Sequence, residues 1–414
     1  MNSAAAGDII TVNDGIYNET VTLNSIGAGE TLTIQAANSQ QAFWNDAGVA
    51  ITASGITGNF VISGFDLGTS SFTNVTGVVT LDDNLIDNVS GTNAVSANAT
   101  GTNEMGLHLL DNDFVTVNGG FTGAINIDAD TTAGGSFDFV ADSNDFTGLG
   151  SNGIRVGDVS QVELTGGTLT ARVTDNTFNG RTGFGTDIEF DIGGNNSNNY
   201  FASILIDGNL TNTGGAPSFV ADALFINFDG VGTTILADIS NNSFLHHDSG
   251  IFVDGESVQD GGVFNSRFDG NTISNTVREG LHIRPFSAPG GNTAVWNTVI
   301  TGNTISNIDN DLSGGANGHN GIEIEADSTS SDDYTWNLDL IGNNVSMAAG
   351  SSGSPILVDA NSTSNAIVNI ERDIASNNTG SVTIDDPGSI VTMPSANAVT
   401  DSNELRTISG FVFN

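Results

Sequence analysis

One short pattern recurs along most of the chain and restricts the possible folds more than any other feature of the sequence. It consists of an apolar residue, two small or polar residues, an asparagine, any residue and a second apolar residue, as in Phe268–Ile273 and Ile300–Ile305. A pattern that recurs every 28 to 40 residues indicates a solenoid, in which each repeat packs on its neighbours. The asparagine of the pattern falls at ten positions: Asn84, Asn112, Asn144, Asn176, Asn209, Asn242, Asn271, Asn303, Asn343 and Asn377.

A second pattern lies between these asparagines and consists of a glycine followed by alternating apolar residues. Each repeat therefore contains at least two short strands separated by turns. Strands this short cannot bury an apolar face alone, so they must stack in register on their copies, at about 4.8 Å per coil. We predict an all-β fold, a single-stranded right-handed parallel β-helix of at least ten coils of about 28–40 residues. The clearest copies of the second pattern are Gly153–Val156, Gly250–Val253, Gly280–Ile283 and Gly321–Ile324.

The asparagine is expected to occupy the same sharp bend in every coil. Asparagine tolerates a left-handed backbone conformation better than most residues. Its side-chain amide can also bond the amide of the equivalent residue in the next coil, as in stacked asparagine ladders. We therefore predict that the ten asparagines form one column.

The charge balance excludes several classes of partner. The chain has 8 basic residues, all arginine, and 48 acidic residues, which gives a formal net charge of -40. Nucleic acid and anionic membrane surfaces are poor partners for such a protein, because both need basic residues. The chain has no cysteine, and no apolar run is long enough to span a membrane. No signal peptide begins at Met1, and we expect any export signal to have been removed.

The copies of "x-G-N-T-I-S-N" and "G-I-x-V" make residues 8 to 390 resemble the pectate-lyase-like superfamily of right-handed parallel β-helices. The segment Gly7–Tyr17 is similar to the opening of such domains, where the first strand leads into an N-terminal cap. The resemblance implies a cap and first strand over residues 1–30 and a β-helix over residues 31–392. It also implies that the outer face of one sheet is the place where related enzymes carry their catalytic groups and bind polysaccharide.

The end of the chain resembles a different kind of domain. Ile408–Asn414 is similar to the first strand of the calcium-binding, Ig-like B-type repeats of large bacterial surface proteins. We therefore expect residues 393–414 to be a linker and the start of a following repeat. The resemblance implies a repeat domain of a large bacterial secreted or cell-surface protein.

Strand alternation places the residue between two inward positions on the outer face. Three consecutive coils would then present Phe252 with Asp254, His282 with Arg284, and Glu323 with Glu325. In one interpretation this face is a saccharide groove, where imidazole or guanidinium acts as base or charge stabiliser, carboxylates act as acids or calcium ligands, and phenyl rings stack on sugars. The candidate catalytic residues are His282, Arg284, Glu323, Glu325 and Asp254, and the candidate ligand-binding residues are Phe252, Phe225, Glu189 and Asp191.

A simpler interpretation of the same face remains open. Arg284 would lie between Asp254 and Glu325 and would relieve the repulsion within an acidic ladder. The Arg-x-Lys segment of galacturonan hydrolases is missing, since the chain has no lysine, and Arg278 beside Glu279 is the one other basic residue near this face.

Metal sites are not indicated by any complete motif. His246 and His247 are too few for a metal site with Asp248 alone. The Asp-rich segments Asp309–Asp311 and Ser331–Asp333 lack EF-hand spacing and are either solvated turns or calcium-binding loops. No cofactor is required, and Ca²⁺ is the one ion that we expect to bind.

Two functions remain from the sequence, beside a third, glycan binding without turnover, which would use the same face as the second. The first, which we favour, is an extracellular structural or adhesive module of a bacterial surface protein that contacts polysaccharide or another cell-surface molecule. The second is a polysaccharide lyase or glycoside hydrolase that acts on the face from Phe252 to Glu325. Long loops often flank clefts, and the 40-residue step between Asn303 and Asn343 supplies one beside this face. The sequence leaves the ligand and the oligomeric state open.

Overall fold

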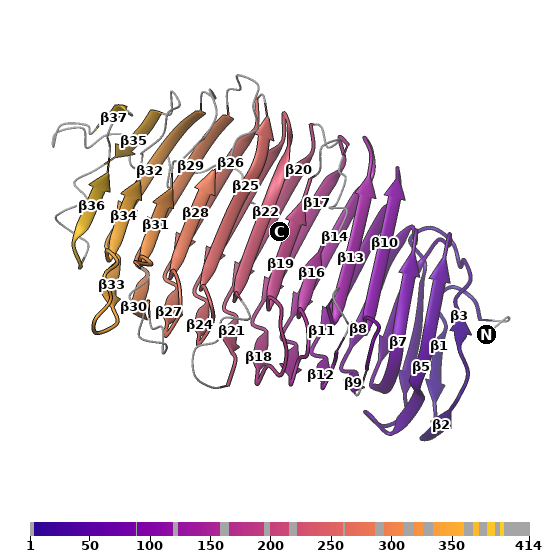
Figure 1. Cartoon of the computed structure of the whole chain (residues 1–414). Helices are drawn as coiled ribbons and strands as arrows, with labels where there is room; N and C mark the ends of the chain where they lie inside the picture. The colour runs from indigo at the N-terminus through magenta and orange to yellow at the C-terminus, as the bar shows by residue number, and fades with distance from the viewer. Residues whose placement is uncertain are drawn as a thin grey trace. The chain divides into compact units, whose positions relative to one another are not determined.

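The computed structural model contains two compact units, residues 1–191 and residues 192–414. Each unit consists of successive coils, and Figure 1 labels their strands in chain order. The structure describes residues 4–87, 89–118, 123–157, 165–193, 199–214, 222–259, 261–285, 294–309, 318–325, 334–359, 367–371, 379–385 and 390–392.

In the first unit, parallel strands stack on three sides of each coil. One side is formed by β1 (Ile9–Val12), β4 (Thr31–Ala36), β6 (Asn59–Ser63), β8 (Gly77–Asp82), β11 (Glu104–Leu110), β14 (Ser136–Asp142) and β17 (Thr168–Thr174). The short second side is formed by β9 (Leu85–Asp87), β12 (Asp113–Val115), β15 (Asp145–Thr147) and β18 (Thr177–Asn179). The third side is formed by β10 (Val95–Gly101), β13 (Ile125–Thr131), β16 (Ile154–Val156) and β19 (Ile188–Ile192), and before them come β2 (Gly15–Tyr17), β3 (Val21–Thr22), β5 (Ala42–Ser54) and β7 (Phe65–Thr73).

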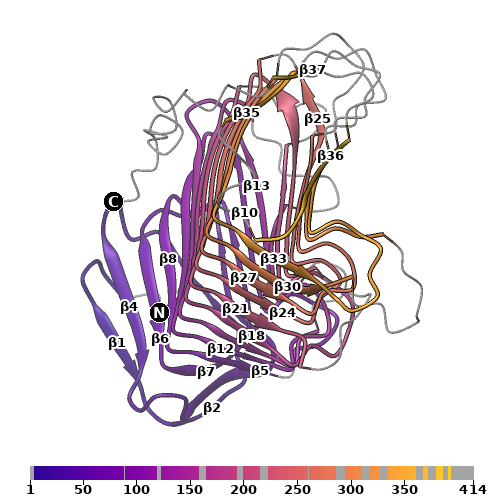
Figure 2. The same cartoon turned by 90° about the vertical axis from the view of Figure 1, so that its left-hand side faces the viewer.

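The second unit repeats the same three sides. The first side is formed by β20 (Phe201–Asp207), β23 (Thr234–Ser240), β26 (Val263–Asp269), β29 (Ala294–Thr301), β32 (Tyr334–Ile341), β35 (Ile367–Glu371) and β37 (Ile390–Thr392). The short second side, stacked in order in Figure 2, is formed by β21 (Leu210–Asn212), β24 (Ser243–Leu245), β27 (Thr272–Ser274), β30 (Thr304–Ile308) and β33 (Asn344–Met347). The third side is formed by β22 (Leu224–Val231), β25 (Ile251–Gln259), β28 (Leu281–Pro285), β31 (Ile322–Glu325), β34 (Ile356–Asp359) and β36 (Val382–Asp385).

The predicted all-β solenoid is confirmed, and its parallel strands are consistent with a right-handed β-helix. The expected number of coils was slightly too high. Among the described residues, about nine turns are complete, from the coil that begins with β8 to the coil that begins with β32. The reason lies at the two ends, where strands such as β5 and β36 do not follow the regular succession of three strands per coil.

The asparagines stack in a buried column within each unit. In the first unit, both the backbone N–H and the side-chain amide of Asn112 donate to Oδ1 of Asn144, each over 3.0 Å. The amide of Asn112 also donates to the backbone carbonyl of Leu81, over 2.9 Å. The same bonds to the next asparagine link Asn84 to Asn112 and Asn144 to Asn176, and in the second unit they link Asn209, Asn242, Asn271, Asn303 and Asn343 in turn. Asn377 lies outside the described residues.

The left-handed bend falls one residue earlier than we expected. The residue before each of these asparagines has a positive φ, whereas the asparagine itself does not. Glycine meets this demand at no steric cost, and aspartate or asparagine tolerates it. These preceding residues are Asp83, Asp111, Ser143, Asp175, Gly208, Asn241, Gly270, Gly302 and Gly342.

Like side chains also stack in the core. The rings of Phe114, Phe146 and Phe178 lie nearly parallel, with centroids 4.6 and 4.5 Å apart. Ring planes one coil apart thus bury their faces against each other rather than against water. In the second unit, Phe264 contacts Trp296, and Trp296 contacts Trp336, at 4.8 and 5.8 Å.

None of the helices among the described residues is long and apolar enough to cross a membrane. The expected cap over residues 1–30 contains β1 to β3, and the boundaries that we drew at residues 30 and 392 stay predictions. The expected linker and following repeat, residues 393–414, lie outside the described residues.

We predict that Asn144→Ala lowers the free energy of unfolding by about 3–5 kcal/mol, because the change removes several buried hydrogen bonds and leaves the donors of Asn112 unpaired. Urea unfolding followed by circular dichroism measures the change. The matched control is Asn179→Ala, at an exposed position in the next coil, which should change stability by less than about 0.5 kcal/mol. Equal effects of the two substitutions would contradict a structural role for the column.

Candidate functional site

The candidate site lies on the outer side of the third-side strands of the second unit. Strand register aligns two outward rows across consecutive coils. The residues between these rows point inward, and Val253, Ile283 and Ile324 are fully buried. The first row is Phe225, Phe252, His282, Glu323 and Leu357, and the second row contains Asn227, Asp254 and Arg284, followed by Glu325 and Asp359. We refer to these two rows as the outer face.

Three rings follow one another along the first row. The centroids of Phe225 and Phe252 are 5.4 Å apart, and the imidazole of His282 stacks on Phe252 at 5.0 Å with an angle of 17° between the planes. The guanidinium carbon of Arg284 lies 5.4 Å from the centroid of Phe252 and supplies a cation–π contact. The row is half-buried, so part of each ring remains accessible.

Arg284 is paired with the aspartate of the preceding coil. Its Nε donates to Oδ1 of Asp254 over 3.3 Å, and its Nη2 donates to Oδ2 over 2.5 Å. The side chain of Asp254 is only 5% exposed, so the carboxylate is held for this contact. Arg284 thus neutralises the charge of Asp254, as expected if this arginine relieves repulsion within an acidic ladder. Glu325 in addition bonds to His282, and the charge of Arg284 also acts on Glu325.

His282 is the centre of the acidic part of the face. Its Nε2 lies 2.8 Å from Oε2 of Glu325. Ligand atoms of Glu279 and Glu323 lie within 4.8 Å of the imidazole and of each other. Burial by itself would lower the pKa of His282, but the hydrogen bond that its imidazole donates to Glu325 and the charges of Glu323 and Glu279 outweigh it and raise the pKa above its usual value.

The two glutamates of β31 have pKa values that are shifted in opposite directions. Burial raises the pKa of Glu323, and the charge of His282 only partly offsets it. The hydrogen bond from His282 lowers the pKa of Glu325. Two carboxyl groups that lie two residues apart on one strand thus differ in their affinity for a proton.

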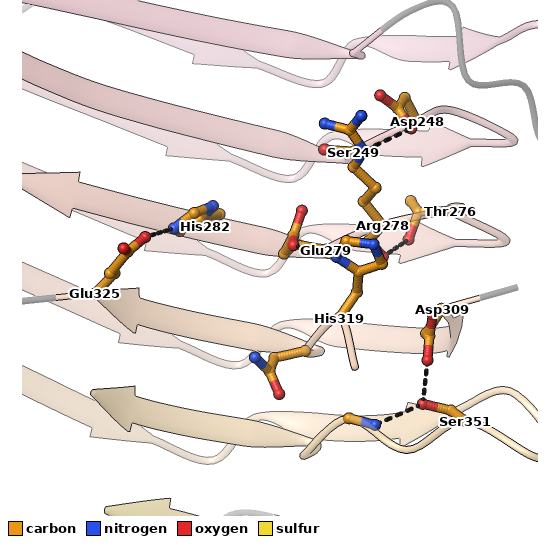
Figure 3. A network of polar contacts seen from close by, with 12 residues as sticks. Asp248, Ser249, Thr276, Arg278, Glu279, His282, Asp309, His319, Glu325 and Ser351 are labelled. Atoms are coloured by element: carbon orange, nitrogen blue, oxygen red, sulfur yellow. Dashed lines mark hydrogen bonds and ion pairs between the residues drawn. The ribbon is translucent and has the colours of Figure 1, made fainter. Parts of the chain in front are cut away.

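The turn before β28 adds a residue that the sequence analysis did not place in the site. Glu279 precedes the glycine of the "G-L-x-I" copy, and Figure 3 shows it between the imidazoles of His282 and His319. Its Oε1 lies 2.7 Å from Nδ1 of His319. Burial raises the pKa of Glu279, but the hydrogen bond from His319 and the charge of His282 lower it below its usual value. The signal available in the sequence was its position directly before a repeated glycine, because that position ends the turn beside the outward row.

Two predicted ligand-binding residues form ion pairs within the first unit. Glu189 and Asp191 belong to the first unit, where Arg155 reaches both, with Nε 3.0 Å from Glu189 and Nη2 3.8 Å from Asp191. Burial raises the pKa of Glu189 in spite of Arg155. The three side chains form a compensated group of charges.

The remaining motifs are engaged in structural contacts. His247 is fully buried and its Nε2 lies 2.8 Å from the hydroxyl of Thr211, while Nδ1 of His246 lies 3.1 Å from Oδ1 of Asn212. Asp309 accepts a hydrogen bond from the hydroxyl of Ser351 over 2.7 Å. The other residues of the two Asp-rich segments, 310–311 and 331–333, lie outside the described residues.

Comparison with known proteins finds a similarity among solved structures. The Dettilon tailspike protein gp208 matches with 12% sequence identity and a TM-score of 0.36, over 91% of this chain and 62% of that chain. The chain thus spans less than two thirds of the length of that tailspike. No protein-family model matches the sequence, and no curated protein matches it.

Asp222, which lies just before β22, makes the stability of the protein depend on pH. Its Oδ1 accepts a hydrogen bond from the backbone N–H of Ser249 over 3.1 Å. Burial and the charge of Asp248 raise the pKa of Asp222 from 3.8 to about 6. A carboxyl group whose pKa is raised by folding contributes its stability at low pH and loses it as the pH rises through the folded-state value.

We predict that Asp222→Asn makes the protein more stable than the wild type above pH 6, by up to about 3 kcal/mol, and leaves stability nearly unchanged below pH 4. The amide keeps the acceptor for Ser249 and removes the charge. Urea unfolding between pH 3.5 and pH 8 measures the difference. Glu104→Gln, at an exposed position, is the control and should give no such pH-dependent gain. A gain that is equal at all pH values would be inconsistent with a raised pKa at Asp222.

Proposed function

We propose that this chain is an extracellular β-solenoid module that binds a glycan along the outer face of the second unit. The observation that carries the proposal is the row of rings Phe225, Phe252 and His282, with neighbouring centroids 5.4 and 5.0 Å apart. Aromatic faces in a half-buried row offer apolar area to the faces of sugar rings. Polar groups beside such a row fix the orientation of a bound ligand. Arg284 and Glu323 supply them here.

The charge of the face restricts the class of glycan. Arg284 is already paired with Asp254, and Arg278 lies 3.4 Å from Asp248. The carboxylates of Glu323 and Glu325 stand beside the ring row, and the whole chain has a net charge of -40. A polyuronate would be repelled by this face unless Ca²⁺ bridged the two, so we expect a neutral or N-acetylated polysaccharide.

We predict that Phe252→Ala lowers the affinity for such a glycan about tenfold, which corresponds to the loss of about 1.4 kcal/mol. A glycan array identifies the ligand and isothermal titration calorimetry measures its affinity. Phe184→Ala is the matched control, because Phe184 is 77% exposed and belongs to the first unit. The control should bind like the wild type. Equal loss in both variants, or retention of full affinity in Phe252→Ala, would exclude the ring row as the binding surface.

A second candidate function, glycan cleavage by a lyase or hydrolase, is favoured by one observation. Glu323 and Glu325 lie on the same strand with pKa values shifted up and down, and such a difference separates a proton donor from an ionised partner. Catalysis would require both carboxyl groups to lie beside the sugar that the row of rings holds.

The test of cleavage is a screen of acidic and neutral polysaccharides, with calcium and with chelator, for unsaturated products and new reducing ends. If the chain is an enzyme, Glu323→Gln should remove product formation and leave the circular dichroism spectrum unchanged. Absence of product on every substrate, together with glycan binding, leaves the binding module as the function.

A further inference from the structure

Three side chains of metal-binding type converge where β28 and β31 begin. Glu279 precedes β28, His282 lies on β28 and Glu323 lies on β31, and one ligand atom from each lies within 4.8 Å of the other two. We propose that these three residues bind a divalent first-row transition metal ion, with Zn²⁺ as the test ion. Three protein ligands leave a coordination position open for water or a ligand. This site goes beyond glycan binding and does not depend on it.

The three ligand atoms need to move only a little to share one ion. Zinc lies about 2.0–2.2 Å from imidazole nitrogen and carboxylate oxygen, so two atoms that share the ion are at most about 4.4 Å apart. Rotation of the glutamate side chains is sufficient to bring the three atoms within that limit. His282 and Glu323 are register partners on adjacent parallel strands, and the buried Ile283 and Ile324 anchor these strands in the core.

Two of the candidate ligands are oriented by a hydrogen bond to a further side chain. Glu325 bonds Nε2 of His282 at 2.8 Å, and a neutral imidazole that donates from Nε2 keeps the lone pair of Nδ1 for a metal. His319 bonds Oε1 of Glu279 at 2.7 Å and leaves the other carboxylate oxygen for the ion. A carboxylate that orients a metal-binding histidine is the usual arrangement outside the ligands of a metal site.

The third ligand is oriented through a buried amide. Oδ1 of Asn320 accepts a hydrogen bond from the backbone N–H of Ser354 over 2.7 Å, and this fixes which end of the amide faces the site. The NH₂ end then bonds the carboxylate of Glu323. Asn320 is 5% exposed, so this orientation is set by the packing of the turn.

The charges and donor types select the kind of ion. Arg278 pairs with Asp248 and Arg284 with Asp254, while Glu279, Glu323 and Glu325 gather around the imidazole of His282. A divalent cation would neutralise part of this negative charge. Calcium prefers a shell of six to eight oxygen atoms, whereas an imidazole nitrogen with two carboxylates suits zinc and its neighbours in the first row.

The direct test is calorimetric titration of the full chain, stripped with EDTA, with Zn²⁺ in the presence of excess Ca²⁺. We expect one equivalent of Zn²⁺ to bind. His282→Gln should weaken binding by at least about 100-fold, and Glu323→Gln and Glu279→Gln by at least about tenfold each. The matched control is His108→Gln, because His108 pairs with a single carboxylate, that of Asp138, at 2.9 Å. It should leave the affinity unchanged.

If a variant fails to fold, NMR of the wild-type chain still tests the site. The ¹⁵N resonances of the His282 imidazole should shift on addition of one equivalent of Zn²⁺, while those of His108 should not. The proposal is overturned if Zn²⁺ does not bind, if excess Ca²⁺ displaces it, or if His282→Gln binds as tightly as the wild type. A shift confined to other histidines also overturns it.

Discussion

The hydrogen-bonded asparagine column is the interaction on which the coil register depends. A buried amide that lacks partners costs about 1–3 kcal/mol, so each asparagine must find both a carbonyl and the asparagine of the next coil. Asn242 does so with Ile206 and Asn271. Slippage of one coil by one residue would break these bonds and turn every inward side chain outward. The column therefore holds each coil at one register relative to the next.

In-register stacking has a consequence for a chain this acidic. Outward residues of successive coils become close neighbours, and carboxylates in one row would repel each other. Several arginines among the described residues lie opposite aspartates, as in the pairs Arg267 with Asp238 and Arg284 with Asp254. Around His282 the balance differs, because Glu279, Glu323 and Glu325 gather near its imidazole, and His319 also bonds Glu279. The outer face is thus divided into a compensated part and a part with excess negative charge, and the second part is where a cation or a proton can be held.

The sequence contained enough information for the coils and for the outward rows. A fixed asparagine and strict alternation predict which residues share a row, and the structure places Phe252, His282 and Glu323 in consecutive coils of one row. Alternation applies only within strands, however. It does not predict where a turn residue points, and for this reason Glu279 was not placed beside His282. The choice of Glu325 between Arg284 and His282 depends on side-chain rotamers, which no sequence pattern specifies.

The position of the left-handed bend could also be predicted only in part from the sequence. The repeated asparagine marked the corner, but the pattern did not reveal which residue of the corner carries the positive φ. The structure assigns it to the preceding position, where Gly270 and Gly302 stand in the clearest copies. The glycine and the asparagine of "G-N-T" therefore have separate roles, because the glycine makes the bend and the asparagine bonds to the next coil.

Disulfide trapping tests most directly whether this register brings residues that are far apart in the sequence together on one outer face. The chain has no cysteine, so a pair can be introduced without competition. The account predicts that His282→Cys combined with Glu323→Cys forms an intramolecular disulfide on mild oxidation, detected by mass spectrometry, because paired strands place these Cα atoms within the range of about 4.4–6.8 Å that a disulfide spans. Phe252→Cys combined with Glu323→Cys, two coils apart, should not form one. Absence of the first disulfide, or formation of both with equal ease, would contradict the account.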